Sequence, residues 1–374
     1  MARLLVTGGA GFIGANFVRY WLDRHPHDRV VVLDALTYAG NRASLAAAEG
    51  QSAFRFVQGD IRDQDLVESV LDVESIDTIV HLAAESHVDR SISGPDLFLD
   101  VNVGGTHTLL KAARKVWLDH SGQAPLPHRF HHVSTDEVYG SLGPDDPPFS
   151  ETNAYAPNSP YAASKAAADY MVRAYHHTYG LETTISNCSN NYGPYQFPEK
   201  LIPLCIVCLL EGRELPIYGD GLQIRDWLHV DDHCRGIDRI LEQGQVGETY
   251  NIGTHNEQTN IDLVHTLCHI LDHQFAEDPS LGKRYPEAPP AQGQTCISRI
   301  AFVKDRPGHD RRYAIDATRI TRELGFGSMV PFEAGLEQTL RWYLTNEPWW
   351  RGVMDESYSE WIAEQYEGRE LEGK

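Results

Sequence analysis

The segment that most constrains the fold stands at the start of the chain. Residues 4–6 form a short apolar run, the glycine-rich loop 7–14 follows, and the next residues have the pattern of a helix to about Arg24. Glycines between a strand and a helix let the backbone approach a pyrophosphate, which the helix N-terminus attracts. A second apolar run at 30–33 ends in Asp34, where a carboxylate would bind an adenosine ribose and repel a 2′-phosphate. The pattern predicts an NAD site, rather than an NADP site, formed by Gly8, Gly11, Phe12, Ile13, Gly14 and Asp34.

The next segments favour a nucleotide-binding sheet over the alternative, a glycine turn with a helix cap and an unrelated surface aspartate. Apolar runs at 54–57, 77–82 and 130–133 predict further buried strands, and helical patterns lie between them. This alternation, without an internal repeat, predicts an α/β fold with a Rossmann-type doubly wound parallel sheet. We expect a dinucleotide across the strand ends to contact Asp60, Ile61, Ala83 and Ala84, with Ser86 and His87 extending the rim.

The second half of the chain has a different character. Glycine and proline become frequent and the predicted elements become shorter after residue 187. A chain of 374 residues is long enough for two lobes. We expect residues 1–186 to form the NAD-binding domain, with returning segments near 222–247 and 300–318, and residues 187–374 to form a smaller, interleaved, mixed α/β substrate lobe. The sequence also predicts a Pro/Gly loop at 121–127 and an acidic surface helix at 355–374.

Composition excludes several classes of function. The formal charge of −21 argues against a nucleic-acid or anionic-membrane surface, because either would need a basic face. Six cysteines are too few for a disulfide scaffold, and Cys205 and Cys208 lie in an apolar helical run that favours small core residues over a redox or zinc pair. The histidines show no metal-ligand spacing, so we expect no metal. The N-terminus lacks a signal-peptide pattern and no apolar run could span a bilayer, so we expect a cytoplasmic protein.

The segment 133–140 places two hydroxyls and two carboxylates directly after a predicted strand. Ligands bind beyond the carboxyl ends of strands in a doubly wound sheet, so these side chains are candidates for chemistry. About twenty residues further on, Ser159 and Pro160 predict a helix start, and helical spacing places Tyr161 and Lys165 on one face. A nearby cation and a positive nicotinamide ring would lower the pKa of a phenol toward the working pH. A surface lysine beside a core tyrosine is the alternative.

Asp136 and Glu137 distinguish between possible reactions. Oxidation of an alcohol needs neither of them, whereas an elimination needs one acid and one base. Adjacent carboxyls in a closed site acquire different pKa values and can supply both. An acidic pair aligned with a helix dipole is the alternative. The cations of the glycine- and proline-rich loops suit a diphosphate, although any single one could be a solvated surface charge; they are Lys200, Arg225, Arg306, His309 and Arg311.

These motifs resemble a known family. The glycine loop with Tyr161 and Lys165 resembles the extended short-chain dehydrogenase/reductases, and Ser134-Thr135-Asp136-Glu137-Val138-Tyr139-Gly140 resembles the nucleotide-sugar 4,6-dehydratases among them. Further matching motifs follow in order over about residues 1–345, at 36–41, 83–91, 188–194, 198–203, 224–227 and 305–310.

The resemblance implies a hydro-lyase that uses tightly held NAD on dTDP-glucose and forms a homodimer through helices near 102–118 and 160–179. The implied catalytic residues are Thr135, Asp136, Glu137, Tyr161 and Lys165. The implied cofactor contacts add Thr37, Ser86, Asn102, Ser134 and Asn190 to those above, together with Tyr161 and Lys165. The implied substrate contacts are Ser86, His87, Thr135, Asp136, Glu137, Asn190, Lys200, Leu201, Pro216, Tyr218, Arg225, Asn260, Arg306 and His309.

Three other functions remain open at this point. A UDP-sugar 4-epimerase would use the same glycine loop and Tyr161–Lys165 pair but would not need Asp136 and Glu137. A dehydratase acting on another nucleoside-diphosphate hexose would use the same residues, and Asp220, which stands where many relatives carry a basic residue, leaves the nucleobase undecided. A non-catalytic NAD-binding regulator should have lost Tyr161 or Lys165.

Overall fold

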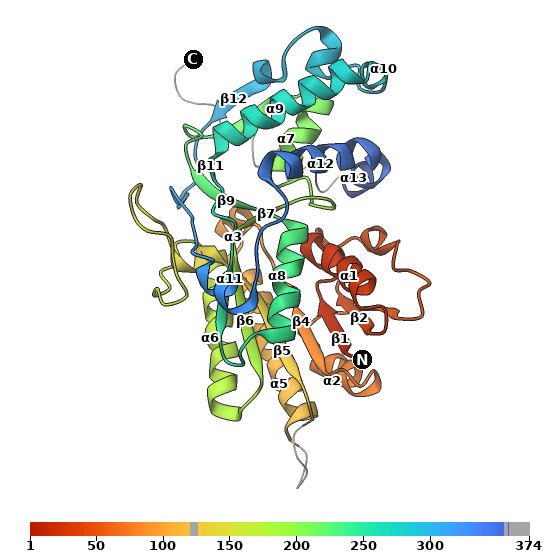
Figure 1. Ribbon diagram of the computed structural model, residues 1–374, viewed down its shortest axis with the longest axis vertical. Coiled ribbons are helices and arrows are strands. Elements are labelled where there is room, and N and C mark those ends of the chain that lie inside the picture. The colour runs from red at the N-terminus through yellow and green to blue at the C-terminus, as the bar shows by residue number, and fades with distance from the viewer. Residues whose placement is uncertain (120–125, 355–357, 359–374) are drawn as a thin grey trace.

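The computed structural model describes residues 1–119, 126–354 and 358. Most of the predicted loop at 121–127, and the predicted acidic helix at 355–374 apart from Tyr358, lie outside the described residues. Figure 1 shows a larger lobe built around one sheet and a smaller lobe above it. In the part of the chain that the structure describes, no helix is long and apolar enough to cross a membrane.

The larger lobe contains a seven-stranded sheet in the order β10-β6-β5-β4-β1-β2-β3. All neighbouring strands are parallel, which confirms the predicted doubly wound sheet. The order reverses between β1 and β4, and such a switch point is where ligands bind. The strands are β1 (Arg3–Thr7), β2 (Arg29–Asp34), β3 (Phe54–Gln58), β4 (Thr78–His81), β5 (Arg129–Thr135), β6 (Thr183–Cys188) and β10 (Thr249–Ile252).

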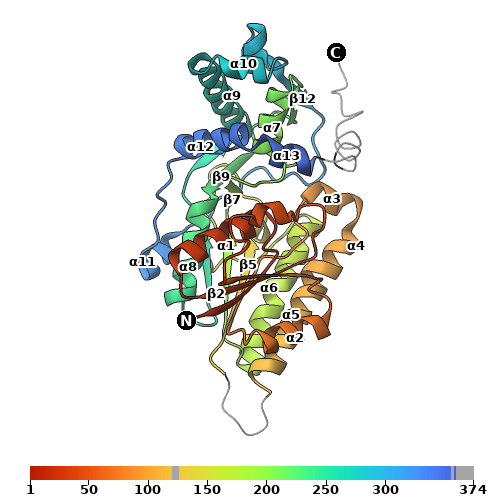
Figure 2. The same cartoon turned by 90° about the vertical axis from the view of Figure 1, so that its right-hand side faces the viewer.

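Helices cover both faces of this sheet because its strands are apolar on both sides. Successive strand residues point to opposite faces, so in β1 Leu4 and Val6 join one core while Leu5 joins the other. The first core lies under α1 (Phe12–Arg24), α8 (Val230–Gln243) and α11 (Thr318–Leu324). The second lies under α2 (Gln64–Val73), α5 (Thr106–Trp117) and α6 (Pro160–Tyr179). Figure 2 shows α1 and α8 on one side of the sheet and α2, α5 and α6 on the other.

Short helical elements follow the carboxyl ends of three strands of the main sheet. The segment after β4 forms α3 (Val88–Ser93), α4 (Pro95–Phe98) and the π-helical η2 (Leu99–Gly105), and a 3₁₀ turn, η3 (Asp136–Tyr139), follows β5. A further 3₁₀ turn, η1 (Arg42–Leu45), follows β2.

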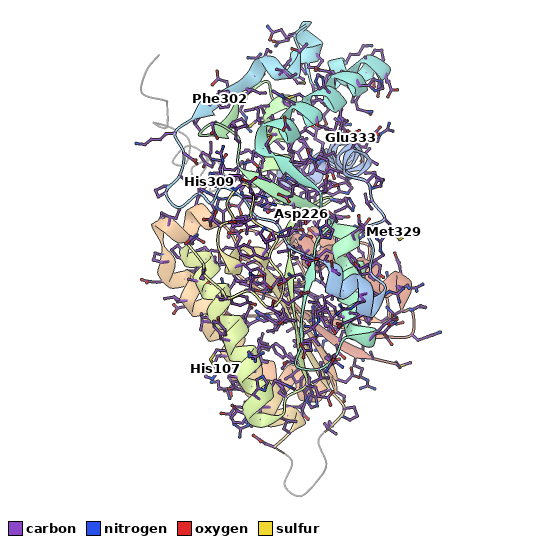
Figure 3. The ribbon with its side chains drawn as sticks, turned by 60° about the vertical axis from the view of Figure 1, so that its left-hand side comes forward. His107, Asp226, Phe302, His309, Met329 and Glu333 are labelled. Atoms are coloured by element: carbon purple, nitrogen blue, oxygen red, sulfur yellow. The ribbon has the colours of Figure 1, made fainter. Side chains whose placement is uncertain are left out.

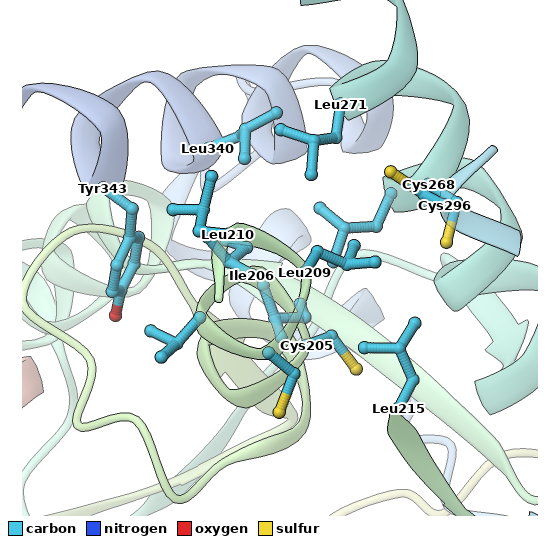
Figure 4. Close-up of a cluster of buried hydrophobic side chains, with 14 of the residues drawn as sticks. Cys205, Ile206, Leu209, Leu210, Leu215, Cys268, Leu271, Cys296, Leu340 and Tyr343 are labelled. Atoms are coloured by element: carbon cyan, nitrogen blue, oxygen red, sulfur yellow. The ribbon is translucent and has the colours of Figure 1, made fainter. Parts of the chain in front are cut away.

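The smaller lobe contains two small sheets and a helical core. One sheet has the order β11-β9-β7 and the other pairs β12 with β8. Figure 4 shows the core, in which Cys205, Ile206 and Leu209 of α7 meet Leu271 and Leu340. The elements are β7 (Asn190–Tyr192), α7 (Leu201–Leu210), β8 (Leu215–Tyr218), β9 (Ile224–His229), β11 (Glu257–Thr259), α9 (Asn260–Glu277), α10 (Ser280–Arg284), η4 (Pro289–Gln292), η5 (Cys296–Arg299), β12 (Ile300–Val303), α12 (Phe332–Thr345) and α13 (Glu347–Val353).

The chain passes between the lobes more than once. After residue 187, α8, β10 and α11 return to the main sheet, whereas β9 and β12 belong to the small sheets. The returning segments were expected near 222–247 and 300–318. In the structure the chain returns to the main sheet at 230–252 and again at 318–324, which is later in both cases. Cys205 and Cys208 are buried and free within the apolar α7, which fits the prediction of small core residues.

Candidate active site

A cavity of about 470 Å³ lies at the carboxyl ends of the central strands. Residues from the glycine loop, from the ends of β2 to β5 and from the start of α6 line it, together with residues near β7. The structure thus brings together segments far apart in the chain. The predicted residues in its wall are Gly8, Gly11, Phe12, Ile13, Gly14, Asp34, Thr37, Asp60, Ile61, Ala83, Ala84, Ser86, Ser134, Thr135, Asp136, Glu137, Tyr161, Lys165, Asn190 and Lys200.

The glycine loop forms a cradle that larger residues could not form. Gly8 has a φ of +71°, and a Cβ there would lie 2.6 Å from the backbone nitrogen of Ala83. A Cβ on Gly14 would clash with the carbonyl oxygen of Gly8. Glycine is therefore needed for the turn and for the closeness of the loop to β4. The exposed backbone at the start of α1 fits the pyrophosphate of a dinucleotide.

Asp34 has a second task besides the one predicted. Its Oδ2 accepts a hydrogen bond from the backbone N–H of Ala10 at 2.9 Å, and its Oδ1 accepts one from Leu36 at 2.8 Å. The carboxylate therefore braces the glycine loop while it lines the cavity. Burial raises the pKa of Asp34, and the two backbone hydrogen bonds oppose that rise. A carboxylate at this place fits an adenosine ribose better than a phosphorylated one.

Asn102 does not line the cavity, unlike the other predicted cofactor residues. Its side chain is buried in η2. Its Oδ1 accepts from the backbone N–H of Glu85 at 2.8 Å, and its Nδ2 donates to the carbonyl of Glu85 and to the Ser164 hydroxyl, both at 2.9 Å. These bonds place Asn102 as a support that ties the rim after β4 to α6.

Helix α6 presents Tyr161 and Lys165 to the cavity. The Ser159 hydroxyl caps the helix by accepting from Ala162 N–H at 3.1 Å, as predicted. Burial raises the pKa of Tyr161 well above 10, Glu137 adds to the rise, and a hydrogen bond with Thr135 opposes it. The Lys165 ammonium donates to the carbonyl of Val133 at 2.8 Å. The protein groups therefore favour the neutral phenol, and a bound nicotinamide ring would supply a positive charge that lowers its pKa.

Asp136 and Glu137 have different surroundings although they are adjacent. Asp136 is 2 % exposed, and burial raises its pKa well above the usual range, with further rises from Glu137 and Asp226. Glu137 is partly accessible, and burial also raises its pKa, but Arg306, Arg225 and Lys200 favour its charged form. Burial raises both pKa values, and the cations lessen the rise at Glu137, so Asp136 is the better proton donor and Glu137 the better proton acceptor of the pair.

The predicted cations approach this pair from the smaller lobe. Arg306 donates to Asp89 at 2.8 Å, and Lys200 donates to the carbonyl of Ser86 at 2.9 Å. Arg225 donates to the carbonyl of Asp310 at 2.9 Å. These bonds hold three cations close enough to favour ionisation of Glu137.

His309 and Arg311, which were also predicted to bind a diphosphate, differ from these three cations. His309 lies at the boundary between the lobes, as does Asp226 (Figure 3), and burial together with Arg306 lowers its pKa to about 4. His309 is therefore a neutral hydrogen-bonding group at neutral pH, not a positive charge. Arg311 pairs with the exposed Asp220 at 2.9 Å.

The remaining predicted substrate residues do not line the cavity. His87 precedes α3, and burial lowers its pKa well below the usual range. The Tyr218 hydroxyl donates to Asp89 at 3.0 Å, so it shares this carboxylate with Arg306. Leu201 begins α7, Pro216 lies on β8, and Asn260 begins α9.

Several site residues were not predicted. Asp226 is buried, accepts from the Thr254 hydroxyl at 3.1 Å and raises the pKa of Asp136. Tyr38 and Glu199 line the cavity. Position in the chain could have identified these three residues, because each of them lies within a segment that resembles the family. Chemistry by itself did not single them out.

Together, a parallel sheet with a glycine cradle and a Tyr–Lys pair at its strand ends define a class: an enzyme of the short-chain dehydrogenase/reductase type. The family model for GDP-mannose 4,6 dehydratase matches residues 5–339. A dTDP-glucose 4,6-dehydratase of Xanthomonas campestris pv. campestris (strain B100) is 54% identical over 359 residues, with 96% of this chain and 97% of that protein covered. The chain belongs to the nucleotide-sugar 4,6-dehydratase family, alongside the dTDP-glucose 4,6-dehydratases.

Solved structures give the same result. The crystal structure of DesIV, a dTDP-glucose 4,6-dehydratase from Streptomyces venezuelae with NAD bound, has a TM-score of 0.81 and 49% sequence identity and covers 94% of this chain and 99% of that one. A UDP-glucose 4-epimerase of Thermotoga maritima has a TM-score of 0.77 at 26% identity, with 92% and 99% covered. The fold is thus common to both reactions, and the site must distinguish them.

Proposed function

We propose that the protein converts dTDP-glucose to dTDP-4-keto-6-deoxyglucose and water, with NAD as its resident cofactor. One observation carries the proposal: Asp136, Glu137 and Tyr161 together line a cavity whose wall fits a dinucleotide, and cations oppose the burial-induced rise in pKa at Glu137 more than at Asp136. The bound nicotinamide would accept a hydride from sugar carbon 4 and later return it to carbon 6, so that no external oxidant is needed.

The first task of the protein is to remove a proton from the sugar 4-hydroxyl. Tyr161 is the group placed for this, and the Thr135 hydroxyl that bonds it can hold the same sugar oxygen. Lys165 lines the same wall one helical turn from Tyr161 and would bring a positive charge to this side of the cavity. Removing this proton as the hydride leaves forms the ketone at carbon 4, which acidifies the hydrogen on carbon 5.

The second task is elimination across carbons 5 and 6. Glu137 takes the carbon 5 proton, since Arg306, Arg225 and Lys200 oppose the rise in its pKa and favour its carboxylate form. Asp136 gives its proton to the leaving 6-hydroxyl, because burial and adjacent acids keep it protonated. The C–H electron pair forms the C5–C6 double bond, the C–O bond breaks, and water leaves. The returned hydride at carbon 6 and a proton at carbon 5 complete the 6-deoxy sugar.

Isotope transfer tests this reaction directly. With dTDP-glucose deuterated at carbon 4, the product should carry the label at carbon 6 and no external NAD should be reduced. Label that stays at carbon 4 with inverted configuration would identify a 4-epimerase, and no conversion with retained NAD would indicate a regulator. A parallel assay with UDP-, CDP- and GDP-glucose measures nucleobase preference, which Asp220 and its partner Arg311 leave open.

We also infer a homodimer that forms through α5 and α6. Tyr170 and Tyr179 are 56% and 44% exposed on α6, and Leu99 is exposed on the adjoining η2. Helices α5 and α6 pack on each other, with Arg114 over the Tyr179 ring at 4.1 Å. Tyr170→Glu should convert the dimer to a monomer in sedimentation analysis, whereas Met329→Glu, at an exposed apolar residue elsewhere, should not. A wild-type monomer would refute this.

We propose that this reaction takes place in the cytoplasm. All six cysteines are free and buried, which suits a reducing compartment. Cell fractionation would test this, since recovery with secreted proteins would contradict it.

A further inference from the structure

A group of buried polar side chains lies behind Lys165, and the proposed reaction uses none of it. Successive strand residues alternate between faces, so His132 and Ser134 of β5 point the same way. Lys165 and Asp169 are one helical turn apart on α6, which packs against β5. An acid and a base on the strand and helix that carry the catalytic groups therefore meet inside the protein.

The contacts within this group form a chain from Asp169 to Lys165. One Asp169 oxygen, Oδ2, accepts from the Ser134 hydroxyl at 2.8 Å, and the other, Oδ1, lies 3.2 Å from His132 Nε2. That ring nitrogen lies 3.4 Å from the Lys165 ammonium, which donates to the Val133 carbonyl at 2.8 Å. His132 is 0 %, Asp169 2 % and Lys165 4 % exposed, so water does not screen these charges.

The protonation of this group follows from its burial. Burial and Lys165 both lower the pKa of His132 well below its usual range, and burial with His132 does the same for the adjoining His81. Both rings are therefore neutral. His81 has hydroxyl partners on both sides, at 2.7 Å to Thr7 and 2.9 Å to Thr106. An isolated ammonium in such a place is unfavourable unless a negative charge compensates it.

We propose that Asp169 is a positioning residue: the buried counter-ion that keeps Lys165 charged and, with His132 and Ser134, holds its ammonium at the end of β5 beside Tyr161. The inference rests on the proposed function insofar as Lys165 assists Tyr161. Asp169 does not line the cavity, so it acts through Lys165 and not on the substrate.

The electrostatics of the surrounding groups agree with this role. Burial lowers the pKa of Lys165, and Asp169 is the first group that opposes this, followed by Cys188 of β6. Burial raises the pKa of Asp169, while Lys165, Ser134 and Tyr155 oppose this rise. The resulting pKa is about 7. Tyr139 of η3 faces the same carboxylate, whose charge raises the pKa of that phenol. Tyr161 and Glu137 complete the titratable groups around this position on the cavity side.

The test compares Asp169→Asn with Asp169→Glu in the full-length protein. The amide keeps the size of the side chain and accepts the Ser134 hydrogen bond, but it removes the charge. Lys165 should then lose its proton at lower pH, so the alkaline limb of kcat against pH should move down by about one pH unit or more. Asp169→Glu keeps the negative charge, so its alkaline limb of kcat should lie close to that of the wild type. His132→Gln, which keeps the charge on Asp169, should shift it less.

A second readout does not depend on the sugar. Lys165 lies in the wall of the dinucleotide cavity, so the Kd for NAD, measured by calorimetry across pH, should show the same shift in Asp169→Asn. Asp23→Asn, at an exposed aspartate of α1, is the matched control and should leave both profiles unchanged.

The failure of this inference differs from failure of the proposed function. If Asp169→Asn lowers kcat and NAD affinity equally at all pH values and leaves the limbs of both pH profiles unmoved, Asp169 has only a structural role. If Asp169→Asn does not fold, Asp169→Glu should still show a limb close to that of wild type and His132→Gln a smaller downward shift. A displaced limb in Asp169→Glu together with an unmoved limb in His132→Gln would overturn the inference. Wild-type protein that binds NAD but does not convert dTDP-glucose would refute the proposed function, while the calorimetric comparison would still test Asp169.

Discussion

Glu137→Gln should separate the two halves of the proposed reaction. The amide has nearly the same shape as the carboxylate but cannot accept the carbon 5 proton. Tyr161 and Thr135 are unchanged, so hydride removal from carbon 4 should continue. Elimination should then become the slow step, and the bound cofactor should accumulate in its reduced form with the 4-keto sugar beside it.

The expected size of the effect follows from the role of Glu137. A positioned general base contributes about 10²- to 10⁴-fold to a rate, or roughly 3–5 kcal/mol at 1.36 kcal/mol per tenfold. Arg306, Arg225 and Lys200 favour the carboxylate form of Glu137, whereas burial and the neighbouring acids raise the pKa of Asp136 well above the usual range, so Asp136 does not replace Glu137 as the base. We therefore expect kcat to fall by about 10²- to 10⁴-fold while the first turnover of cofactor reduction stays within a factor of about ten.

The pH dependence has a definite sign. Glu137 must be ionised and its pKa is raised, so kcat falls as pH decreases through a value above the usual glutamate range. Asp136 must be protonated, and its pKa is raised well above the usual range, so the elimination step also slows as pH rises through that pKa; this loss adds to the one from deprotonation of Lys165. A raised carboxyl pKa contributes stability that is present below the unfolded-state value and lost as pH rises through the folded-state value. Glu137→Gln removes that loss and should unfold at a higher temperature than wild type near neutral pH.

Stopped-flow absorbance of the reduced cofactor under single-turnover conditions measures both steps. Glu151→Gln is the matched control, because burial also raises the pKa of Glu151 but it lies outside the cavity wall. The amide oxygen there can still accept the Asn251 N–H that Glu151 accepts at 2.9 Å. Wild-type turnover by Glu137→Gln, or loss of hydride removal together with elimination, would refute the assignment of Glu137 as the base.

Three further predictions concern binding and stability. Gly14→Ala should weaken NAD retention by about 1–3 kcal/mol, because its Cβ meets the carbonyl of Gly8; unchanged affinity in calorimetry would contradict the cradle. Asp34→Ala should cost about 1–3 kcal/mol in chemical denaturation by leaving two backbone donors unpaired, as well as weakening NAD binding. Arg306→Ala should raise KM for the nucleotide sugar and destabilise the protein by about 3–5 kcal/mol, because it removes one side of the largely buried Arg306–Asp89 ion pair; equal KM would place the diphosphate elsewhere.

The sequence by itself determined the sheet and the segments at its strand ends. Continuous apolar runs, the glycine loop and the Ser159 cap are local signals, and local geometry converts them directly into strands, a turn and a helix start. Because parallel strands end at one edge of a sheet, Gly8, Asp34, Ala83 and Thr135 could be assigned to one cavity before any coordinates existed. They line it together.

The tertiary structure decided how those residues are charged and what supports them. Electrostatic interactions depend on distance and burial, which sequence order does not give. Only the fold places Asp226 against Asp136, makes His309 neutral, turns Asn102 inward and sets Asp169 behind Lys165. Each of these depends on contacts between residues distant in the chain, and desolvation at those contacts, not residue type, determines their protonation states.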